Sequence, residues 1–241
     1  NQLLTRHYSV RKYKSEPIME DELHAMIRAA QHASSANFLQ AYSIVHVTDQ
    51  QLKQEMATLS KNPQQILTAP VFLLFCADLK RLEYACHKHG VQVGADTVES
   101  LLVAVADTAI LAQNLAVAAE SMGYGICYIG GVRNNPEAIS QLVNLPDKTF
   151  PLFGMTIGVP DEQQEVKPRL MLEAVLHENR YDESKYPQLL EQYDDEMARY
   201  YSRRSSNRKD TTWTKTVAAY FEQRRRLFMR DFLSGKGFHM Q

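Results

Sequence analysis

The 241-residue chain has little of what several large protein classes require. Its three cysteines, Cys76, Cys86 and Cys127, are too few and too widely spaced for a disulfide framework. No uninterrupted apolar run reaches the roughly 18 residues of a transmembrane helix. The formal net charge of −1 argues against a broad positive surface for nucleic acid. We therefore expect a soluble, cytoplasmic protein that binds small molecules, with neither nucleic acid nor membrane as a partner.

Three common nucleotide-binding and hydrolase motifs are also absent. Gly123, Gly125 and Tyr128 stand where a G-x-G-x-x-G motif would need three glycines. The chain contains neither G-x-x-x-x-G-K-[ST] nor G-x-S-x-G. A Rossmann dinucleotide site, a P-loop and a serine-hydrolase elbow are therefore disfavoured.

What is present predicts a full hydrophobic core. Hydrophobic residues make up 44% of the chain and charged residues 23%. Because helical and strand-like patterns do not alternate strictly, we expect an α+β fold in one domain spanning residues 1–241. Helical patterns cover residues 15–33, 49–59, 96–122 and much of 185–241, and strand-like patterns cover 42–47, 71–76, 126–129 and 150–157.

Basic residues gather in short segments far apart in the sequence. Residues 6–13 and 167–169 are two of them, and a third lies at 203–209. If folding brought the first two together, their arginines and lysine would form a pocket for a phosphate or carboxylate. Residues 123–131, an apolar strand ending in two glycines, suggest a planar ligand packed against exposed main chain. Each segment taken alone is equally consistent with a solvated loop, a terminal helix or plain core.

A metal site is the weaker interpretation of the run Cys86-His87-Lys88-His89. Zinc needs three or four ligands, and no second ligand pair accompanies this one. Cationic side chains at the C-terminus of a helix explain the same residues. For Cys127 we likewise prefer a small buried apolar residue to a redox role.

Six motifs occur in an order that is similar to one known family. They are H-Y-S-V-R at 7–11, S-S-A-N-F-L-Q at 34–40, the segment 118–134 with its Y-I-G-G-V-R-N ending, P-L-F-G at 151–154, K-P-R-L at 167–170 and H-E-N at 177–179. The chain resembles the flavin-dependent nitroreductase superfamily over nearly its whole length. Within it, the resemblance is to oxygen-insensitive NADPH nitroreductases and NADPH-FMN oxidoreductases of the flavin reductase P type.

The resemblance implies a fold and an assembly. The fold would be a three-layer α+β structure, with a central, mostly antiparallel sheet and helices on both faces. Two chains would form a domain-swapped homodimer with an FMN site at each subunit interface. Residues 185–241 would be a helical extension around the dimer, and residues 202–212 would form its coenzyme loop.

The resemblance also implies which residues bind FMN and NADPH. Tyr8 stands where the family usually has arginine, and Gln64 is assigned by allowing a one-residue slip from Pro63. The implied FMN-binding residues are His7, Tyr8, Ser9, Arg11, Ser34, Ser35, Leu39, Gln40, Gln64, Tyr128, Ile129, Gly130, Gly131, Lys167 and Arg169. The implied contacts to the 2′-phosphate of NADPH are Arg203, Arg204 and Arg208.

The implied activity is a two-electron, ping-pong oxidoreductase reaction. NADPH would reduce FMN, and a nitroaromatic, a quinone or free flavin would then accept the electrons. No protein nucleophile or metal is expected. Two other classes stay open: a flavin-binding storage or sensor protein with low turnover, and an interaction module that uses the basic segments at 203–209 and 224–226.

Overall fold

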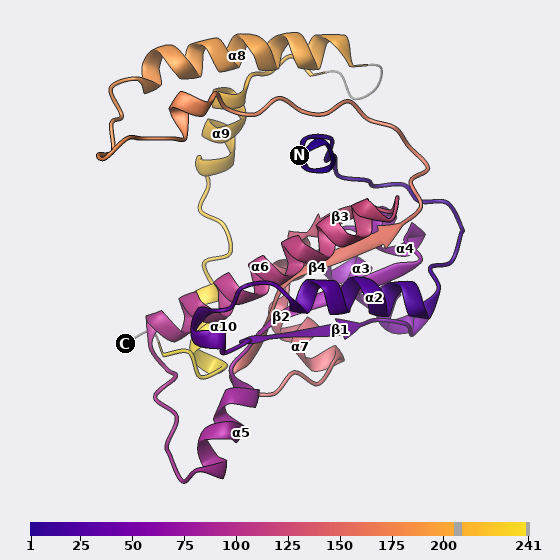
Figure 1. The fold of residues 1–241 in the computed structure, drawn as a ribbon, viewed down its shortest axis with the longest axis vertical. Helices are drawn as coiled ribbons and strands as arrows, with labels where there is room; N and C mark the ends of the chain where they lie inside the picture. Colours follow the sequence, from indigo (N-terminus) through magenta and orange to yellow (C-terminus); the bar gives the residue numbers. More distant parts are fainter. Residues whose placement is uncertain (205–208, 240–241) are drawn as a thin grey trace. The chain divides into compact units, whose positions relative to one another are not determined.

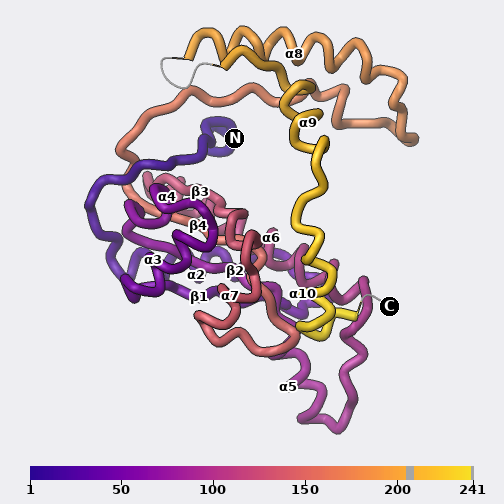
Figure 2. Tube along the Cα trace, turned by 180° about the vertical axis from the view of Figure 1, so that it is seen from behind, coloured from indigo at the N-terminus to yellow at the C-terminus, as the bar shows by residue number. Residues whose placement is uncertain are grey.

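The computed structural model describes residues 1–204 and 209–239, which divide into two compact units. The first unit combines Asn1–Gln163 with Arg226–Gln241, and the second is Gln164–Arg225. Figure 1 and Figure 2 trace both along the chain. A single domain over residues 1–241 stays a prediction.

A four-stranded antiparallel sheet is the centre of the first unit. The strands are β1 (Tyr42–His46), β2 (Val71–Asp78), β3 (Gly125–Ile129) and β4 (Thr149–Gly158). Their order is β1-β2-β4-β3, and every neighbouring pair is antiparallel. The predicted strands at 71–76, 126–129 and 150–157 are confirmed within a residue or two. β3 lies at one edge of the sheet, and this edge carries the candidate site.

Helices cover both faces of the sheet, because alternate residues of β2 enter different cores. Leu73 and Phe75 pack with α2 and α6, whereas Phe72 and Leu74 pack on the other side with α3, α4 and α7. Figure 1 views the first face and Figure 2 the second. The expected three layers are thus confirmed. The helices are α2 (Glu20–Gln31), α3 (Gln50–Ser60), α4 (Pro63–Thr68), α6 (Val98–Ser121) and α7 (Pro136–Leu142).

Helix ends follow the local chemistry of the sequence. The Asp49 carboxylate accepts a hydrogen bond from Leu52 N at 2.9 Å and begins α3. The Asn135 side chain caps α7, with Pro136 at the first helical position. The helix α5 (Lys80–Lys88) ends in His87 and Lys88, as expected for cations at a helix C-terminus. Among the described residues no cluster of metal-binding side chains occurs.

The long helix α6 combines a buried face with an apolar exposed face. Its length and composition alone would suffice to cross a membrane, although only 39% of its most apolar stretch is buried within the structure. Leu111 and Leu115 lie in the core, and Asp107 in the middle of the helix is 1% exposed. Leu102 and Ile110 are 58% and 44% exposed, so part of this helix presents apolar surface.

The second unit has a hydrophobic core of its own. This core contains Tyr193, Met197, Tyr201 and Trp213. The remaining helices of the first unit are α1 (Gln2–Thr5), η1 (Ala36–Phe38), η2 (Gly130–Asn134) and α10 (Met229–Gly235). Those of the second unit are η3 (Leu172–Ala174), α8 (Tyr186–Arg203) and α9 (Trp213–Phe221).

Candidate functional site

The N-terminal basic segment lies along the outer edge of β3. The main-chain N–H of Val10 donates to the carbonyl of Ile126 at 2.9 Å, and that of Lys14 donates to Val159 at 2.9 Å. The buried hydroxyl of Tyr13 donates to Val10 O at 2.7 Å, and burial raises the pKa of Tyr13 well above its usual range. The structure therefore places the H-Y-S-V-R segment beside the first residues of the predicted strand at 123–131, at Gly125 and Ile126.

Two glutamates that the sequence analysis missed hold the side chains of this segment. His7 Nδ1 lies 2.5 Å from Glu120 Oε1. The Tyr8 hydroxyl donates to the main-chain oxygen of Glu162 at 3.3 Å, and burial, with both carboxylates nearby, raises the pKa of Tyr8. The main-chain N–H of Arg11 donates to Glu162 Oε1 at 2.5 Å. The only signal in the sequence was the position of Glu120 inside the motif at 118–134.

Arg11 presents its guanidinium at the surface of the same segment. Its side chain is exposed, and Nη1 donates to the carbonyl oxygen of Ser9 at 3.3 Å. A guanidinium in this position retains donors for an anion, because it has five N–H groups in a planar fork. Of the predicted N-terminal binding residues, Arg11 is the one whose placement best suits a phosphate.

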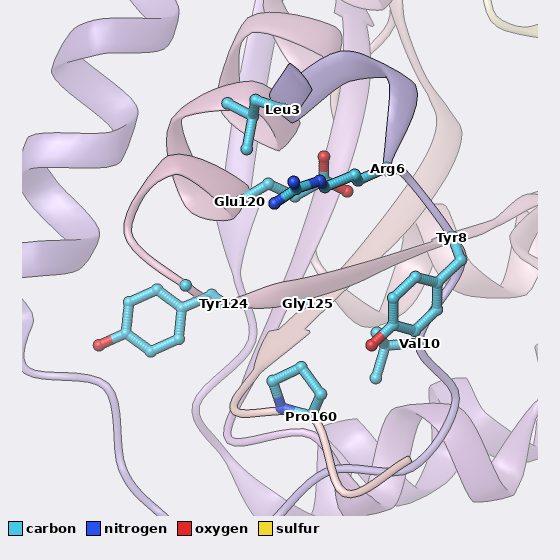
Figure 3. Close-up of a pocket in the computed structure, with 9 residues that line it drawn as sticks. Leu3, Arg6, Tyr8, Val10, Glu120, Tyr124, Gly125 and Pro160 are labelled. Atoms are coloured by element: carbon cyan, nitrogen blue, oxygen red, sulfur yellow. The ribbon is translucent and has the colours of Figure 1, made fainter. Parts of the chain in front are cut away.

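A small pocket opens beside the segment. It encloses about 180 Å³, less than the roughly 300–1,000 Å³ of most small-molecule sites. Figure 3 shows Arg6 and Glu120 together on one side and Tyr8, Val10 and Pro160 on another. A pocket of this size would accommodate only part of a flavin. Its lining is Leu3, Arg6, Tyr8, Val10, Glu120, Gly123, Tyr124, Gly125 and Pro160.

At the end of β3, side chains and main chain have different roles. The Tyr128 ring packs edge-to-face on Phe153 at 5.2 Å, and burial, followed by the Glu120 carboxylate, raises the pKa of Tyr128 to about 12. The Ile129 side chain is 2% exposed within the core. The Ile129 side chain therefore belongs to the core, and its predicted flavin contact stays a prediction.

The two glycines that follow are glycine for different reasons. A Cβ on Gly131 would lie 2.1 Å from Ser60 O and from Asn62 Oδ1, so packing within the protein excludes a side chain. A Cβ on Gly130 would meet only Arg133 Nη2, at an ordinary 3.5 Å. The chain's own packing does not require glycine at position 130. A flat ligand approaching the main chain would require it, and in this respect the residues fit FMN.

The predicted serine-rich segment at residues 34–40 forms hydrogen bonds to the rest of the chain, and part of it is exposed. The Ser35 hydroxyl donates to Asp107 Oδ2 at 2.7 Å and accepts from Gln40 N at 2.7 Å. Ser34 is exposed, and Leu39 is 38% exposed. The exposed Gln64 lies in the first turn of α4. Nothing in these contacts tests the predicted flavin contacts of Ser34, Ser35, Leu39, Gln40 and Gln64, which stay predictions.

In the second unit, cations predicted to bind FMN and NADPH gather at one end of α8. Lys167 Nζ lies 5.6 Å from the centre of the Tyr201 ring, and the Arg204 guanidinium lies 5.7 Å from that of Tyr200. Arg204 also donates to Gln164 Oε1 at 3.1 Å, and Arg169 donates to Lys167 O at 2.5 Å. Arg203 is exposed, and Arg208 lies outside the described residues. The meeting of residues 167–169 with residues 6–13 stays a prediction.

Comparison with protein-family models identifies both parts of the chain. The model described as "Nitroreductase family" matches residues 4–159, and "Nitroreductase family, C-terminal domain" matches residues 167–241. The chain belongs to the nitroreductase family. The predicted resemblance is thereby confirmed.

Full-length relatives of this nitroreductase carry related names. A "CR(VI) reductase" of Pseudomonas sp. (strain G-1) is 52% identical, covering 99% of this chain and 98% of its own. An "Oxygen-insensitive NADPH nitroreductase" of Salmonella typhimurium is 38% identical, covering 98% and 96%. Among solved structures, the NADPH:FMN oxidoreductase of Vibrio harveyi complexed with NAD+ is 37% identical, covers 98% and 96%, and superposes with a TM-score of 0.89. These likenesses confirm the nitroreductase fold.

Proposed function

We propose that this member of the nitroreductase family is an NADPH-dependent, FMN-containing oxidoreductase. The observation that carries the proposal is similarity, over nearly the full length of both chains, to proteins named NADPH nitroreductase and NADPH:FMN oxidoreductase. The site described above has the matching chemistry. A basic N-terminal segment lies beside β3, and Gly130, the residue after the end of this strand, has no side chain to cover its main chain.

When bound, FMN would supply the two-electron redox chemistry, and the residues of this chain would bind and orient it. Ser9 and Arg11 in the first unit, with Lys167 and Arg169 in the second, are the residues proposed to hold its phosphate and the polar edge of its ring. A cation at that edge would favour negative charge there. We assign no acid to the protein, since water can supply the proton.

The functional assembly that we propose is a homodimer. Leu102 and Ile110 on α6 are exposed, and Phe38 in the neighbouring loop is 80% exposed. Exposed apolar surfaces of this kind are typical of protein–protein interfaces. A second copy of the chain would cover them, and the loop at residues 34–40 would then reach a flavin bound mainly by the partner. The cytoplasm is the proposed location.

The electron acceptors proposed are nitroaromatics, quinones and free flavin. Chromate joins them, because the relative with 52% identity is named a Cr(VI) reductase. The second candidate function is flavin storage or sensing with low turnover. The rate at which NADPH reduces the bound flavin separates the two functions.

An anaerobic absorbance spectrum of the purified protein, recorded before and after NADPH or NADH, tests the proposal. We expect a flavin band that NADPH bleaches quickly and NADH slowly, with colour returning when an acceptor is added. Slow bleaching by both coenzymes would favour storage or sensing. Absence of a flavin band after FMN is added would refute the proposal.

A further inference from the structure

The loop between α2 and β1 is held in an unfavourable backbone conformation. Three of its non-glycine residues have positive φ angles: 48° at Asn37, 58° at Phe38 and 54° at Gln40. Residues other than glycine rarely adopt this region, and such strain persists only where surrounding contacts enforce it. Phe38 gains no burial within its own chain in return, since it is 80% exposed there. Some other group must therefore hold the loop.

That group is the carboxylate of Asp107 in the middle of α6. Its Oδ2 accepts hydrogen bonds from Ser35 Oγ at 2.7 Å and from Ala41 N at 3.1 Å, and its Oδ1 accepts from Ala36 N at 2.9 Å. Asp107 is 1% exposed, so these bonds form away from water, where an unpaired carboxylate would be costly. One side chain thus ties both ends of the loop to the core.

Two further contacts extend this connection into the loop. The Ser35 hydroxyl, while donating to Asp107, accepts from Gln40 N at 2.7 Å. From α5, Arg81 donates to Gln40 O at 3.3 Å and to Tyr42 O at 3.2 Å. The main-chain N–H and C=O of Gln40 are both engaged, and its positive φ follows from these bonds.

We propose that Asp107 is a positioning residue for FMN: acting through Ser35, it holds the loop at residues 34–40 in the shape that presents Ser34, Leu39 and Gln40 to the flavin. The inference rests on the proposed function, because the family resemblance assigns these three residues, and Ser35 itself, to FMN. Asp107 itself is buried and touches the loop, not the ligand.

The chemistry of the site explains why aspartate is needed. An asparagine at position 107 would have one acceptor oxygen and one NH₂ group. In one orientation the NH₂ would face Ala36 N–H, and in the other it would face Ala41 N–H. Either orientation sets donor against donor and releases one end of the loop.

The test compares four variants for FMN affinity, measured by flavin fluorescence, and for hydrogen exchange of residues 33–41 in flavin-free protein. Asp107→Asn and Ser35→Ala should speed exchange and weaken FMN binding about tenfold or more. Ser35→Thr, which keeps the hydroxyl, should leave the hydrogen exchange of residues 33–41 as slow as in the unsubstituted protein. Thr108→Val is the matched control: its buried hydroxyl donates to Ala104 O in α6 and to Cys76 O in β2, neither of them in the loop, and its loss should leave FMN affinity unchanged.

Each outcome decides between the positioning role and a purely structural one. Faster exchange with unchanged FMN affinity would overturn the positioning role and leave the proposed function standing. Unchanged exchange in both variants would overturn it too. If the unsubstituted protein bound no flavin, the positioning role and the proposed function would fall together. Should Asp107→Asn fail to fold, Ser35→Ala and its threonine counterpart carry the test, because they leave the carboxylate in place.

Discussion

Adjacent residues of one motif serve different purposes in this protein. Gly131 is a packing requirement, since Ser60 O occupies the place that a side chain would take. The chain itself leaves room for a side chain at position 130. We therefore expect glycine there because a ligand approaches its main chain. Ile129, which is 2% exposed, belongs to the core. Substitutions at these neighbouring residues should therefore affect different quantities, protein stability at one position and FMN affinity at the other.

Alanine at each glycine separates these two purposes. Gly131→Ala should lower the free energy of unfolding by roughly 1–3 kcal/mol, because its Cβ would overlap Ser60 O and Asn62 Oδ1. Gly130→Ala should leave stability nearly unchanged and weaken FMN binding about tenfold. Urea unfolding and flavin titration measure the two quantities. Equal FMN affinity in Gly130→Ala and the unsubstituted protein would remove Gly130 from the site.

The partly buried phenol of Tyr128 should make stability fall at high pH. The pKa of Tyr128 is raised from about 10 to about 12, chiefly by burial. Below pH 10 both folded and unfolded chains keep the phenol proton, and the stabilising contribution is complete. Between pH 10 and 12 the unfolded chain loses this proton first, so the free energy of unfolding falls, by at most about 3 kcal/mol from this group.

Urea unfolding at pH 9 and pH 11 measures this fall. Tyr128→Phe should show a smaller loss of stability between the two pH values than the unsubstituted protein. Tyr84→Phe, at a tyrosine that is 74% exposed on α5, is the control and should lose as much as the unsubstituted protein. An equal loss in all three proteins would contradict the assignment to Tyr128.

Among the helices, α8 has cations from two predicted binding sets beside its C-terminal end. Its C-terminal end brings Lys167, from the predicted FMN set, and Arg204, from the predicted NADPH set, onto the neighbouring rings of Tyr201 and Tyr200. These cations are distant in sequence. The amphipathic helix α8 packs Tyr193, Met197 and Tyr201 inward, and this orientation determines which rings the cations contact. The end of α8 is therefore where we expect the coenzyme's charge to be recognised.

Removing cations at this end should change coenzyme choice more than turnover. The double substitution of Arg204→Ala with Arg208→Ala should raise the KM for NADPH about ten- to a hundredfold, as expected for a lost charge-assisted contact to the 2′-phosphate. The KM for NADH, which lacks that phosphate, should change little. Steady-state kinetics with both coenzymes measures the ratio, and Arg28→Ala, an exposed cation on α2, is the control. An equal loss with NADH would contradict the assignment.

For the molecule as a whole, the apolar surface of α6 sets the expected assembly. Leu102 and Ile110 face outward although water surrounds an isolated chain. Burying such side chains contributes about 25 cal/mol per Å² of apolar surface, which a second copy of this chain would supply. A substitution that dissociates the proposed homodimer should therefore also weaken FMN binding.

A charge on this surface should dissociate the proposed homodimer. Leu102→Glu would place a carboxylate in an apolar interface, and we expect a monomer by light scattering together with weaker FMN binding. Tyr84→Glu, at a more exposed apolar residue on α5, should remain dimeric. A monomeric unsubstituted protein that binds FMN tightly would contradict the proposed assembly.

Much of the fold could be predicted from local patterns. The strand-like pattern at 71–76 predicted β2, and the helical pattern at 49–59 predicted α3, which Asp49 caps, because caps and strand patterns depend on near neighbours. The family was predicted correctly from motif order. At the edge of β3 the main-chain N–H of Val10 in the H-Y-S-V-R motif donates to Ile126 O, and the cofactor contacts of both segments stay predictions.

The amino-acid sequence by itself determined the α+β class, the buried central strand and the membership of the nitroreductase family, since these follow from periodicity, caps and motifs along the chain. Only the tertiary structure decided which motif residues form hydrogen bonds to other parts of the same chain. Glu120 and Glu162 are distant in sequence from His7 and Arg11, and Asp107 is distant from Ser35. Such pairs form only when packing brings separate elements within hydrogen-bonding distance, and that depends on side-chain volumes across the whole core.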